Sequence, residues 1–219
     1  MKTECILEAV ATAYRAFRAQ FVLGKSAEEL FAVFTASLDR SLGEYELLCD
    51  FLCGGDTVNI DGITRDYVPK RGDTILIDIS VGKDGAWCDV CRTYFVGEPS
   101  EAQRETFALI CEALRAGERA LRAGALACDV YAAVNDVYER EGKHLVHHAG
   151  HRVGERALMQ PQFLAENDTP LVCGELYTLE PGLYDGFGIR LENDYLLTKD
   201  GACDLFERLL PLDIKEYVL

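Results

Sequence analysis

Apolar residues recur every three to four positions in four stretches of the chain, a period that predicts amphipathic helices. The expected helices cover 4–20, about 26–42, 100–123 and 127–141. Ser26 followed by Glu29 has the pattern of a capping box at the start of the second helix, and Ser100 opens the third. Strand-like segments follow each pair of helices, at 46–60, 73–82, 86–97, 175–184 and 187–198.

The order helix, helix, strands therefore occurs twice along the chain. Residues 24–33 align with residues 124–133 at an offset of 100, with a glycine first in both and apolar positions that match in type. We expect an α+β fold that forms a single domain over 1–219, with two similar halves of about 1–98 and 99–219 around a shared sheet. A site between two such halves would lie in a cleft.

The charge balance removes several classes of function. The 219 residues include 22 Lys and Arg against 37 Asp and Glu, a formal charge of −15. A surface this acidic repels phosphate backbones and anionic lipids, so we expect neither a nucleic-acid nor a membrane partner. No apolar run approaches the ~18 residues of a membrane span, and the N-terminus lacks a signal-peptide pattern. We expect a soluble, cytoplasmic protein.

The chain has nine cysteines, an odd number, and no export signal, so a disulfide scaffold is not expected. Cys88 and Cys91 have CxxC spacing, but no second CxxC or CxxH completes a zinc site. We expect free thiols that pack as small apolar side chains.

Carboxylates interrupt segments that are otherwise typical of buried strands. They are Asp78, Asp89, Glu180 and Glu192. The turn at 82–85 predicts a hairpin that brings Asp78 and Asp89 side by side. All four histidines of the chain fall within 144–151. Taken one by one, each of these residues also fits a solvated strand edge or turn.

Taken together, the carboxylates and a histidine indicate a shared cation site. Converging carboxylates repel one another, and two divalent cations would cancel four negative charges. Oxygen ligands with a single imidazole suit manganese, cobalt or iron(II) better than a structural zinc site.

The order and spacing of these residues carry a family resemblance. Asp78 and Asp89 are 11 positions apart, as in a D-x10-D pattern, and 147–154 looks like H-G-x-G-H-x-x-G. Residues 178–184 look like T-I-E-P-G-x-Y, and 188–194 look like G-I-R-I-E-D-D. Over its whole length the chain resembles the catalytic domain of the pita-bread metallopeptidases. The last two motifs favour the aminopeptidase P and prolidase branch over methionine aminopeptidase.

The resemblance implies a pita-bread fold around a curved antiparallel sheet, and a dinuclear-metal hydrolase of the Xaa-Pro aminopeptidase or dipeptidase type. The implied metal ligands are Asp78, Asp89, His151, Glu180 and Glu192. Two divalent ions, manganese before cobalt, zinc or iron, would activate a water to attack a peptide or small-amide carbonyl. Glu180 would be the general base. The substrate would be a small peptide or other small molecule. Homodimers are common in the family, so this chain is also a candidate homodimer.

The resemblance also implies roles for residues around the ligands. His147 would be a proton donor, and Arg190 and Tyr184 would orient ligands and substrate. Thr93 closes the family's D-x-T-R-T motif, in which Cys91 replaces the first Thr.

Two family histidines that handle the peptide are missing. One position is Leu158 here, and the region of the other is 59–62. His148 also replaces the first Gly of its motif. Losing a transition-state donor costs ~10²–10³ in rate. A second hypothesis is therefore a lyase or hydrolase that uses the same metal site on a non-peptide substrate. A third is a non-catalytic binding relative, ranked last because all five ligands persist.

Overall fold

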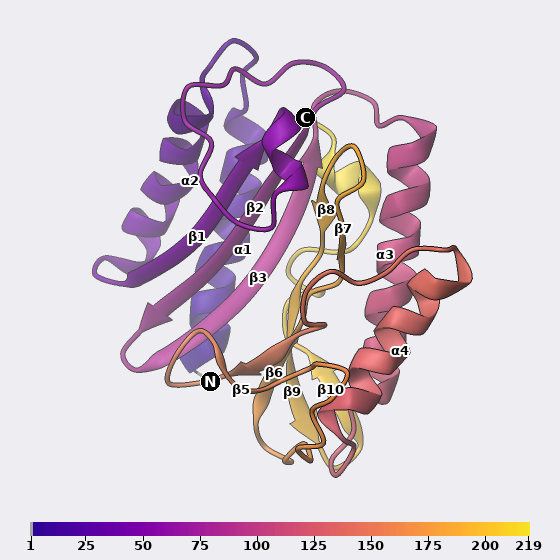
Figure 1. Cartoon of the computed structure of the whole chain (residues 1–219). Helices are drawn as coiled ribbons and strands as arrows, with labels where there is room; N and C mark the ends of the chain where they lie inside the picture. Colours follow the sequence, from indigo (N-terminus) through magenta and orange to yellow (C-terminus); the bar gives the residue numbers. More distant parts are fainter. Residues whose placement is uncertain (1) are drawn as a thin grey trace.

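The computed structural model describes residues 2–219 (Figure 1). Its α-helices are α1 (Lys2–Gln20), α2 (Ala27–Leu42), α3 (Glu101–Ala120) and α4 (Ala127–Arg140). Its longer strands are β1 (Glu46–Cys53), β2 (Thr74–Lys83) and β3 (Ala86–Phe95). The remaining strands are β4 (His151–Val153), β5 (Met159–Gln162), β6 (Leu176–Leu179), β7 (Gly182–Leu183), β8 (Ile189–Arg190), β9 (Asn193–Thr198) and β10 (Gly201–Asp204). Two short 3₁₀ helices, Gly54–Val58 and Ile214–Tyr217, complete the fold.

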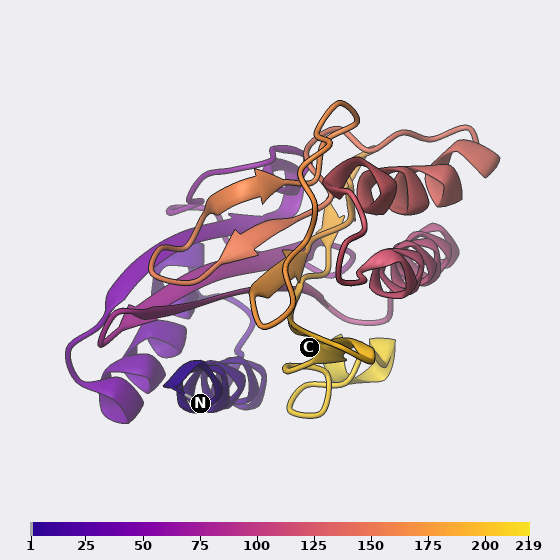
Figure 2. The ribbon, with the colours of Figure 1, turned by 90° about the horizontal axis from the view of Figure 1, so that it is seen from below.

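The first sheet has the antiparallel order β1-β2-β3. Its β2–β3 hairpin closes at Asp84 and Gly85, both at positive φ, as a two-residue hairpin turn requires. Helices α1 and α2 cover one side of this sheet, and β4 and β5 lie on the other (Figure 2). Tyr14 of α1 ties the two layers together because its hydroxyl donates to the carbonyl oxygens of Ile77 and Val90.

The second sheet has the order β10-β9-β6-β4-β5, and β7 and β8 form a separate hairpin. An isolated bridge between Cys91 on β3 and Glu192, just before β9, joins the two sheets. The buried Arg92 strengthens this junction, since its guanidinium donates to the carbonyl oxygen of Glu192 and to Asn193 Oδ1. The segments that carry Asp89 and Glu192 therefore meet where β3 contacts the residue before β9.

The helix predictions are confirmed. The predicted capping box of Ser26 and Glu29 forms in full, and Ser100, predicted only to open its helix, forms a second box with Gln103. Helices α2 and α4 begin at positions 27 and 127, which matches the offset of 100 in the sequence. The prediction of one domain with two related halves stays a prediction.

Three strand predictions were too long. The segment 46–60 ends as a strand at Cys53, because Gly54 adopts φ +60° and a 3₁₀ helix follows. The segment 175–184 breaks at Glu180 and Pro181, since proline cannot donate to a strand ladder. The segment 187–198 breaks at Leu191 and Glu192, where the chain crosses to the first sheet.

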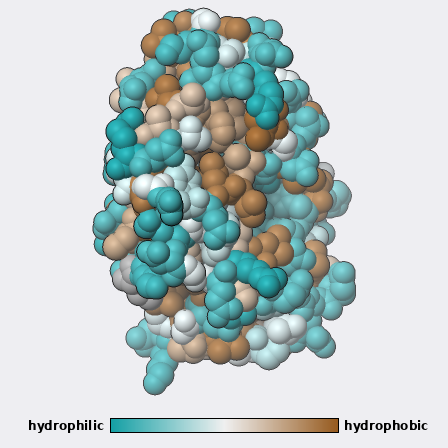
Figure 3. All heavy atoms as spheres, turned by 90° about the vertical axis from the view of Figure 1, so that its left-hand side faces the viewer, coloured by the Kyte–Doolittle hydropathy of each residue, from teal (hydrophilic) through white to brown (hydrophobic). Residues whose placement is uncertain are grey.

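The predictions about cysteines and membrane spans concern residues 2–219. All nine cysteines are unpaired, as expected for a chain without a disulfide scaffold. Within these residues, no helix combines the length and apolar character that crossing a bilayer requires. The face on the α2 and β1 side is largely hydrophilic, with apolar atoms in separate clusters (Figure 3).

Candidate metal centre

All five predicted ligands line one cavity of about 310 Å³. Asp78 comes from β2, Asp89 from β3, His151 from the start of β4, and Glu180 and Glu192 from the breaks after β6 and β8. The cavity is also lined by His147, His148, Leu158 and Arg190. Positions from across the chain thus converge as the sequence predicted.

The hairpin places Asp78 and Asp89 on the same face but not directly opposite one another. Asp78 faces Cys91 and Asp89 faces Ser80 across the β2–β3 ladder. The two aspartates are therefore diagonal neighbours, separated by two register positions. The prediction that they lie side by side is corrected in this respect, because the two-residue turn fixes the register.

Asp89, His151 and Glu192 form the first group that could hold a metal ion. Each offers one ligand atom, and these atoms lie within 4.8 Å of one another. The Nδ1 of His151 lies 3.0 Å from the carbonyl oxygen of Arg152, so Nδ1 carries the proton and donates. Its Nε2 then holds a lone pair, 3.5 Å from Asp89 Oδ2 and 3.6 Å from Glu180 Oε1. All three side chains are buried.

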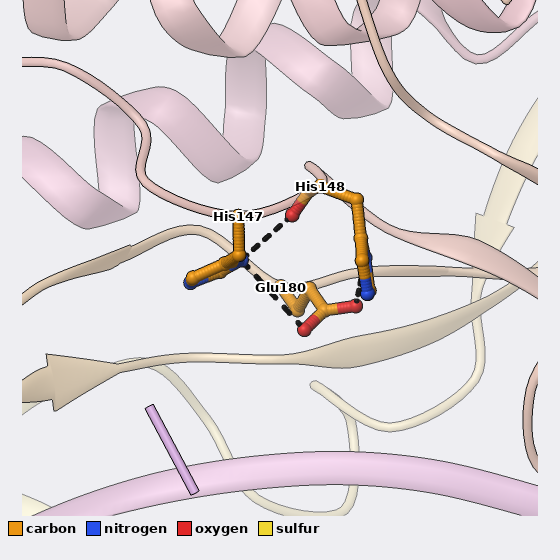
Figure 4. Close-up of side chains that lie close together, drawn as sticks. All are labelled: His147, His148 and Glu180. Carbon is orange, nitrogen blue, oxygen red and sulfur yellow. Dashed lines mark hydrogen bonds and ion pairs between the residues drawn. The ribbon is translucent and has the colours of Figure 1, made fainter. Parts of the chain in front are cut away.

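Glu180, His147 and His148 form the second group (Figure 4). His148 Nδ1 lies 2.9 Å from Glu180 Oε1, and His147 Nδ1 lies 4.0 Å from Glu180 Oε2. The backbone N–H of Glu180 donates to the carbonyl oxygen of Ala149, which holds the glutamate against the histidine segment. Gly150 permits this approach, because a Cβ there would lie 2.0 Å from the carbonyl oxygen of Thr178.

Asp78 belongs to neither group, although it lines the same cavity. Its carboxylate pairs with Arg190, whose Nη2 lies 2.7 Å from Asp78 Oδ2. The same Nη2 lies 3.4 Å from Asp50 Oδ2, and Arg190 Nη1 donates to the carbonyl oxygen of Ile60. The guanidinium thus offsets part of the carboxylate charge in this part of the cavity with the protein's own charge.

The carboxyl groups titrate far from their ordinary ranges. Burial, and then the neighbouring carboxylates, raise the pKa values of Asp89 and Glu192 well above normal. Burial raises the pKa of Asp78 to about 6, although Arg190 opposes the rise. Burial also acts to raise the pKa of Glu180, but the imidazoles of His148, His151 and His147 outweigh it and lower this pKa to about 2.

These features fit divalent cations. Asp89 and Glu192 are costly as neighbouring anions, and a cation would remove that cost. Glu180 Oε1 and His148 Nδ1 are buried and have no hydrogen-bond partner. Thr178 Oγ1 donates to Glu192 Oε1 at 2.7 Å, which orients that carboxylate. Carboxylate oxygens with imidazole nitrogens are the donors that manganese, iron, cobalt and zinc accept.

The residues predicted to surround the metal ligands make contacts of different kinds. Tyr184 hydroxyl lies 2.9 Å from His147 Nε2. The hydroxyl of Thr93 and the thiol of Cys91 both donate to the carbonyl oxygen of Arg190, so they hold β8 in place. Leu158 lines the cavity with half of its surface exposed.

The sequence did not identify His148 as a site residue, apart from its replacement of a motif glycine. Its contact with Glu180 joins positions 32 apart and depends on the path of the chain at Gly150. The clustering of all histidines within eight positions was the one pattern that pointed to it. Asp61, in the region of a missing family histidine, also lines the cavity.

Residues 3–199 match the sequence pattern of Metallopeptidase family M24. The chain belongs to this family. It is 35% identical over 138 residues to the probable dipeptidase PepE of Mycobacterium tuberculosis, a stretch of 61% of this chain and 37% of that protein. It is 30% identical over 145 residues to the Xaa-Pro dipeptidase of Pyrococcus furiosus, or 64% of this chain and 42% of the relative. The matches therefore span well under half the length of these curated relatives.

Solved structures of an X-Pro aminopeptidase and of a prolidase have the same fold as this chain. The X-Pro aminopeptidase of Thermotoga maritima matches 99% of this chain and 62% of its own, with a TM-score of 0.87 and 26% identity. The prolidase of Pyrococcus furiosus matches 93% of this chain and 62% of its own, also with a TM-score of 0.87 and 26% identity. These matches confirm the predicted pita-bread fold, and membership of M24 supports a peptidase-type hydrolase.

Proposed function

We propose that this chain is a hydrolase that uses two divalent metal ions to cleave short peptides, with Xaa-Pro dipeptides as the first substrates to test. The observation that carries the proposal is the convergence of Asp89, His151 and Glu192, with ligand atoms within 4.8 Å of one another in a cavity that Asp78 and Glu180 also line. Xaa-Pro dipeptidases among the relatives motivate the choice of substrate.

Asp89 and Glu192 would bridge the two ions, with Asp78 on one ion and His151 and Glu180 on the other. Manganese is our first choice, because four carboxylates with a single family imidazole form an oxygen-rich donor set. Bound divalent ions lower the pKa of water and polarise a carbonyl oxygen.

The chain's own residues then handle protons and position the substrate. Glu180 Oε2 is the proposed proton acceptor. His147 donates from Nδ1 to the carbonyl oxygen of His148, so its Nε2 accepts from the Tyr184 hydroxyl. Burial lowers the pKa of His147, which keeps the ring neutral near pH 7. We propose that the proton that Glu180 takes from the water passes to the leaving amine, and that His147 holds the Tyr184 hydroxyl in place. Arg190 fixes Asp78.

A second candidate is a non-peptide small molecule acted on at the same centre. Leu158 and the region around Asp61 favour it, because neither offers the imidazole that the family's peptidases use at these places. A non-catalytic binding role is disfavoured, since a protein that no longer bound metal would have no need of buried, mutually repelling carboxylates.

We further propose a cytoplasmic location, which suits nine unpaired cysteines, and leave a homodimer as a proposal from the family resemblance.

The test uses protein purified without chelator, with metal analysis followed by Leu-Pro and Gly-Pro hydrolysis assays in Mn²⁺. Two ions per chain with turnover would support the peptidase. Two ions without turnover would favour the non-peptide substrate. No bound metal would contradict both, and would leave the binding role.

A further inference from the structure

His148 has a contact that the proposed two-ion centre does not use. Its Nδ1 lies 2.9 Å from Glu180 Oε1, and its side chain is 21% exposed against 9% for Glu180. His148 lines the same cavity as the predicted ligands. The family motif has a glycine at this position, so the imidazole is a feature of this chain's own sequence.

The two side chains lie at ion-pair distance, but without the alignment of a hydrogen bond. Both Nδ1 of His148 and Oε1 of Glu180 are buried, and neither has a hydrogen-bond partner. At 2.9 Å, a hydrogen bond requires the N–H to point at the oxygen. A nitrogen and an oxygen that share a cation instead both point at the cation, and hence past one another. Two ligands at about 2.1 Å from one ion lie about 3.0–3.4 Å apart. At 2.9 Å the pair lies just below this spacing, and its lack of hydrogen-bond alignment is what two ligands directed at one ion would show.

The neighbouring histidines are either already engaged or already assigned. His147 uses Nδ1 on the carbonyl oxygen of His148 and Nε2 on the Tyr184 hydroxyl, so it has no free lone pair for a metal. His151 directs Nε2 toward Glu180 Oε1 at 3.6 Å. The Oε1 atom of Glu180 therefore has one imidazole nitrogen at 2.9 Å and another at 3.6 Å.

We propose that His148 Nδ1 is an additional ligand of the ion held by Glu180 and His151. This inference rests on the proposed metal-dependent function. With two imidazoles, the donor set at this position shifts from one that suits manganese toward one that suits zinc, cobalt or iron(II). Mixed loading follows, with an imidazole-preferring metal here and an oxygen-preferring metal beside Asp78.

The experiment measures metal binding to the full chain after chelator treatment, with no activity assay. Wild type, His148→Ala and His148→Gly are titrated with Zn²⁺ and separately with Mn²⁺, in competition with a chromophoric chelator. His144→Ala is the matched control, because His144 is an exposed histidine four positions away.

We expect both His148 variants to bind the first Zn²⁺ at least about 10-fold more weakly, the lower end of what losing even an outer-shell partner costs. Their Mn²⁺ affinity should change less, and His144→Ala should match wild type. X-ray absorption of wild type with one equivalent of Zn²⁺ should show two imidazoles. This second measurement decides the question even if the His148 variants do not fold.

Unchanged Zn²⁺ affinity in both folded variants, or one imidazole at the zinc, would overturn the role of His148 and leave the metal centre intact. Absence of Zn²⁺ and Mn²⁺ binding in wild type would instead overturn the proposed function itself.

Discussion

The two ends of the cavity balance their buried carboxylates in different ways. At the arginine end (Asp50, Asp78 and Arg190), the guanidinium lies 2.7 Å from Asp78 and 3.4 Å from Asp50. At the histidine end (His148, His151 and Glu180), imidazole nitrogens lie 2.9 and 3.6 Å from one carboxylate oxygen. The first end carries a permanent positive charge. At the second end, His151 holds a lone pair at Nε2, and His148 has a pKa that burial lowers but contact with Glu180 raises overall.

This contrast indicates which end of the cavity depends on a metal ion. Arginine stays protonated at any ordinary pH, so one positive charge offsets part of the carboxylate charge at the arginine end with or without an ion. Burial lowers the pKa of His151, which leaves its Nε2 free to bind a cation near neutral pH. We therefore expect the histidine end to bind its ion more tightly, and the ion beside Asp78 to compete with Arg190.

The largest expected effect is on catalysis at the histidine end. Glu180→Gln should keep bound metal but lower kcat by about 10²–10⁴, the range for loss of a general base. Metal analysis and a dipeptide assay on the same sample check this. His144→Ala serves as the control, and full activity in Glu180→Gln would remove its role as base.

The arginine end can be broken by Arg190→Gln. This substitution leaves Asp78 and Asp50 without their buried cation, so the metal-free protein should lose about 3–5 kcal/mol of unfolding free energy. Mn²⁺ should recover part of the loss, because it replaces the missing positive charge. Urea unfolding with chelator and with Mn²⁺ measures both effects.

Arg140→Gln provides the contrast for that experiment. Arg140 pairs with Glu112 at 3.4 Å on the surface, with both side chains more than half exposed. Loss of this ion pair should lower the free energy of unfolding by about 1 kcal/mol or less. Equal losses in the two arginine variants would mean that the Asp78 pair is not a buried counter-charge.

A third change adds an imidazole near the histidine end. Leu158 is 50% exposed and precedes β5, which pairs with the strand that begins at His151. Leu158→His should fold normally and raise kcat on Xaa-Pro dipeptides by at least about tenfold, since one transition-state donor accounts for ~10²–10³. Unchanged kcat in a metal-loaded variant would favour the non-peptide substrate.

The smallest expected effect concerns Asp89 and pH. Its folded-state pKa is raised, so its contribution to stability is present below the ordinary value and is lost as pH rises through the folded value. With chelator present, the melting temperature of Asp89→Asn relative to that of wild type should therefore rise as the pH increases from 5 to 8. Each kcal/mol corresponds to about 2–4 °C for a chain of this size.

Saturating Mn²⁺ should reverse the order of the two proteins at pH 8, because wild type then gains stability from bound metal. A difference in melting temperature that is independent of pH and of metal would contradict the clustering of Asp89 with other carboxylates.

The helices could be predicted because their information is local. Ser26 and Ser100 cap helices through residues three positions away. The five proposed ligands could be found because the family motifs are short and ordered. The break after β6 was missed although Pro181 marks it. The break after β8 was missed because the bridge from Glu192 to Cys91 is a tertiary contact that redirects the chain.

The family resemblance named Arg190 as a residue that orients ligands, but neither its pairing with Asp78 nor the contact of His148 with Glu180 could be predicted from sequence alone. Arg190 reaches Asp78 only because the β7–β8 hairpin turns it back toward β2, across 112 positions. His148 reaches Glu180 only because Gly150 lets two backbone segments approach closely. Both contacts depend on how segments pack, which no local pattern encodes.

The most direct test of the contrast between the two ends is a calorimetric titration of the metal-free chain with Co²⁺, repeated on His151→Ala and Asp78→Asn. We predict two ions per chain, bound in two steps of different affinity, with His151→Ala removing the tighter step and Asp78→Asn removing the weaker one. Two equivalent ions, or no binding in the wild-type protein, would contradict it.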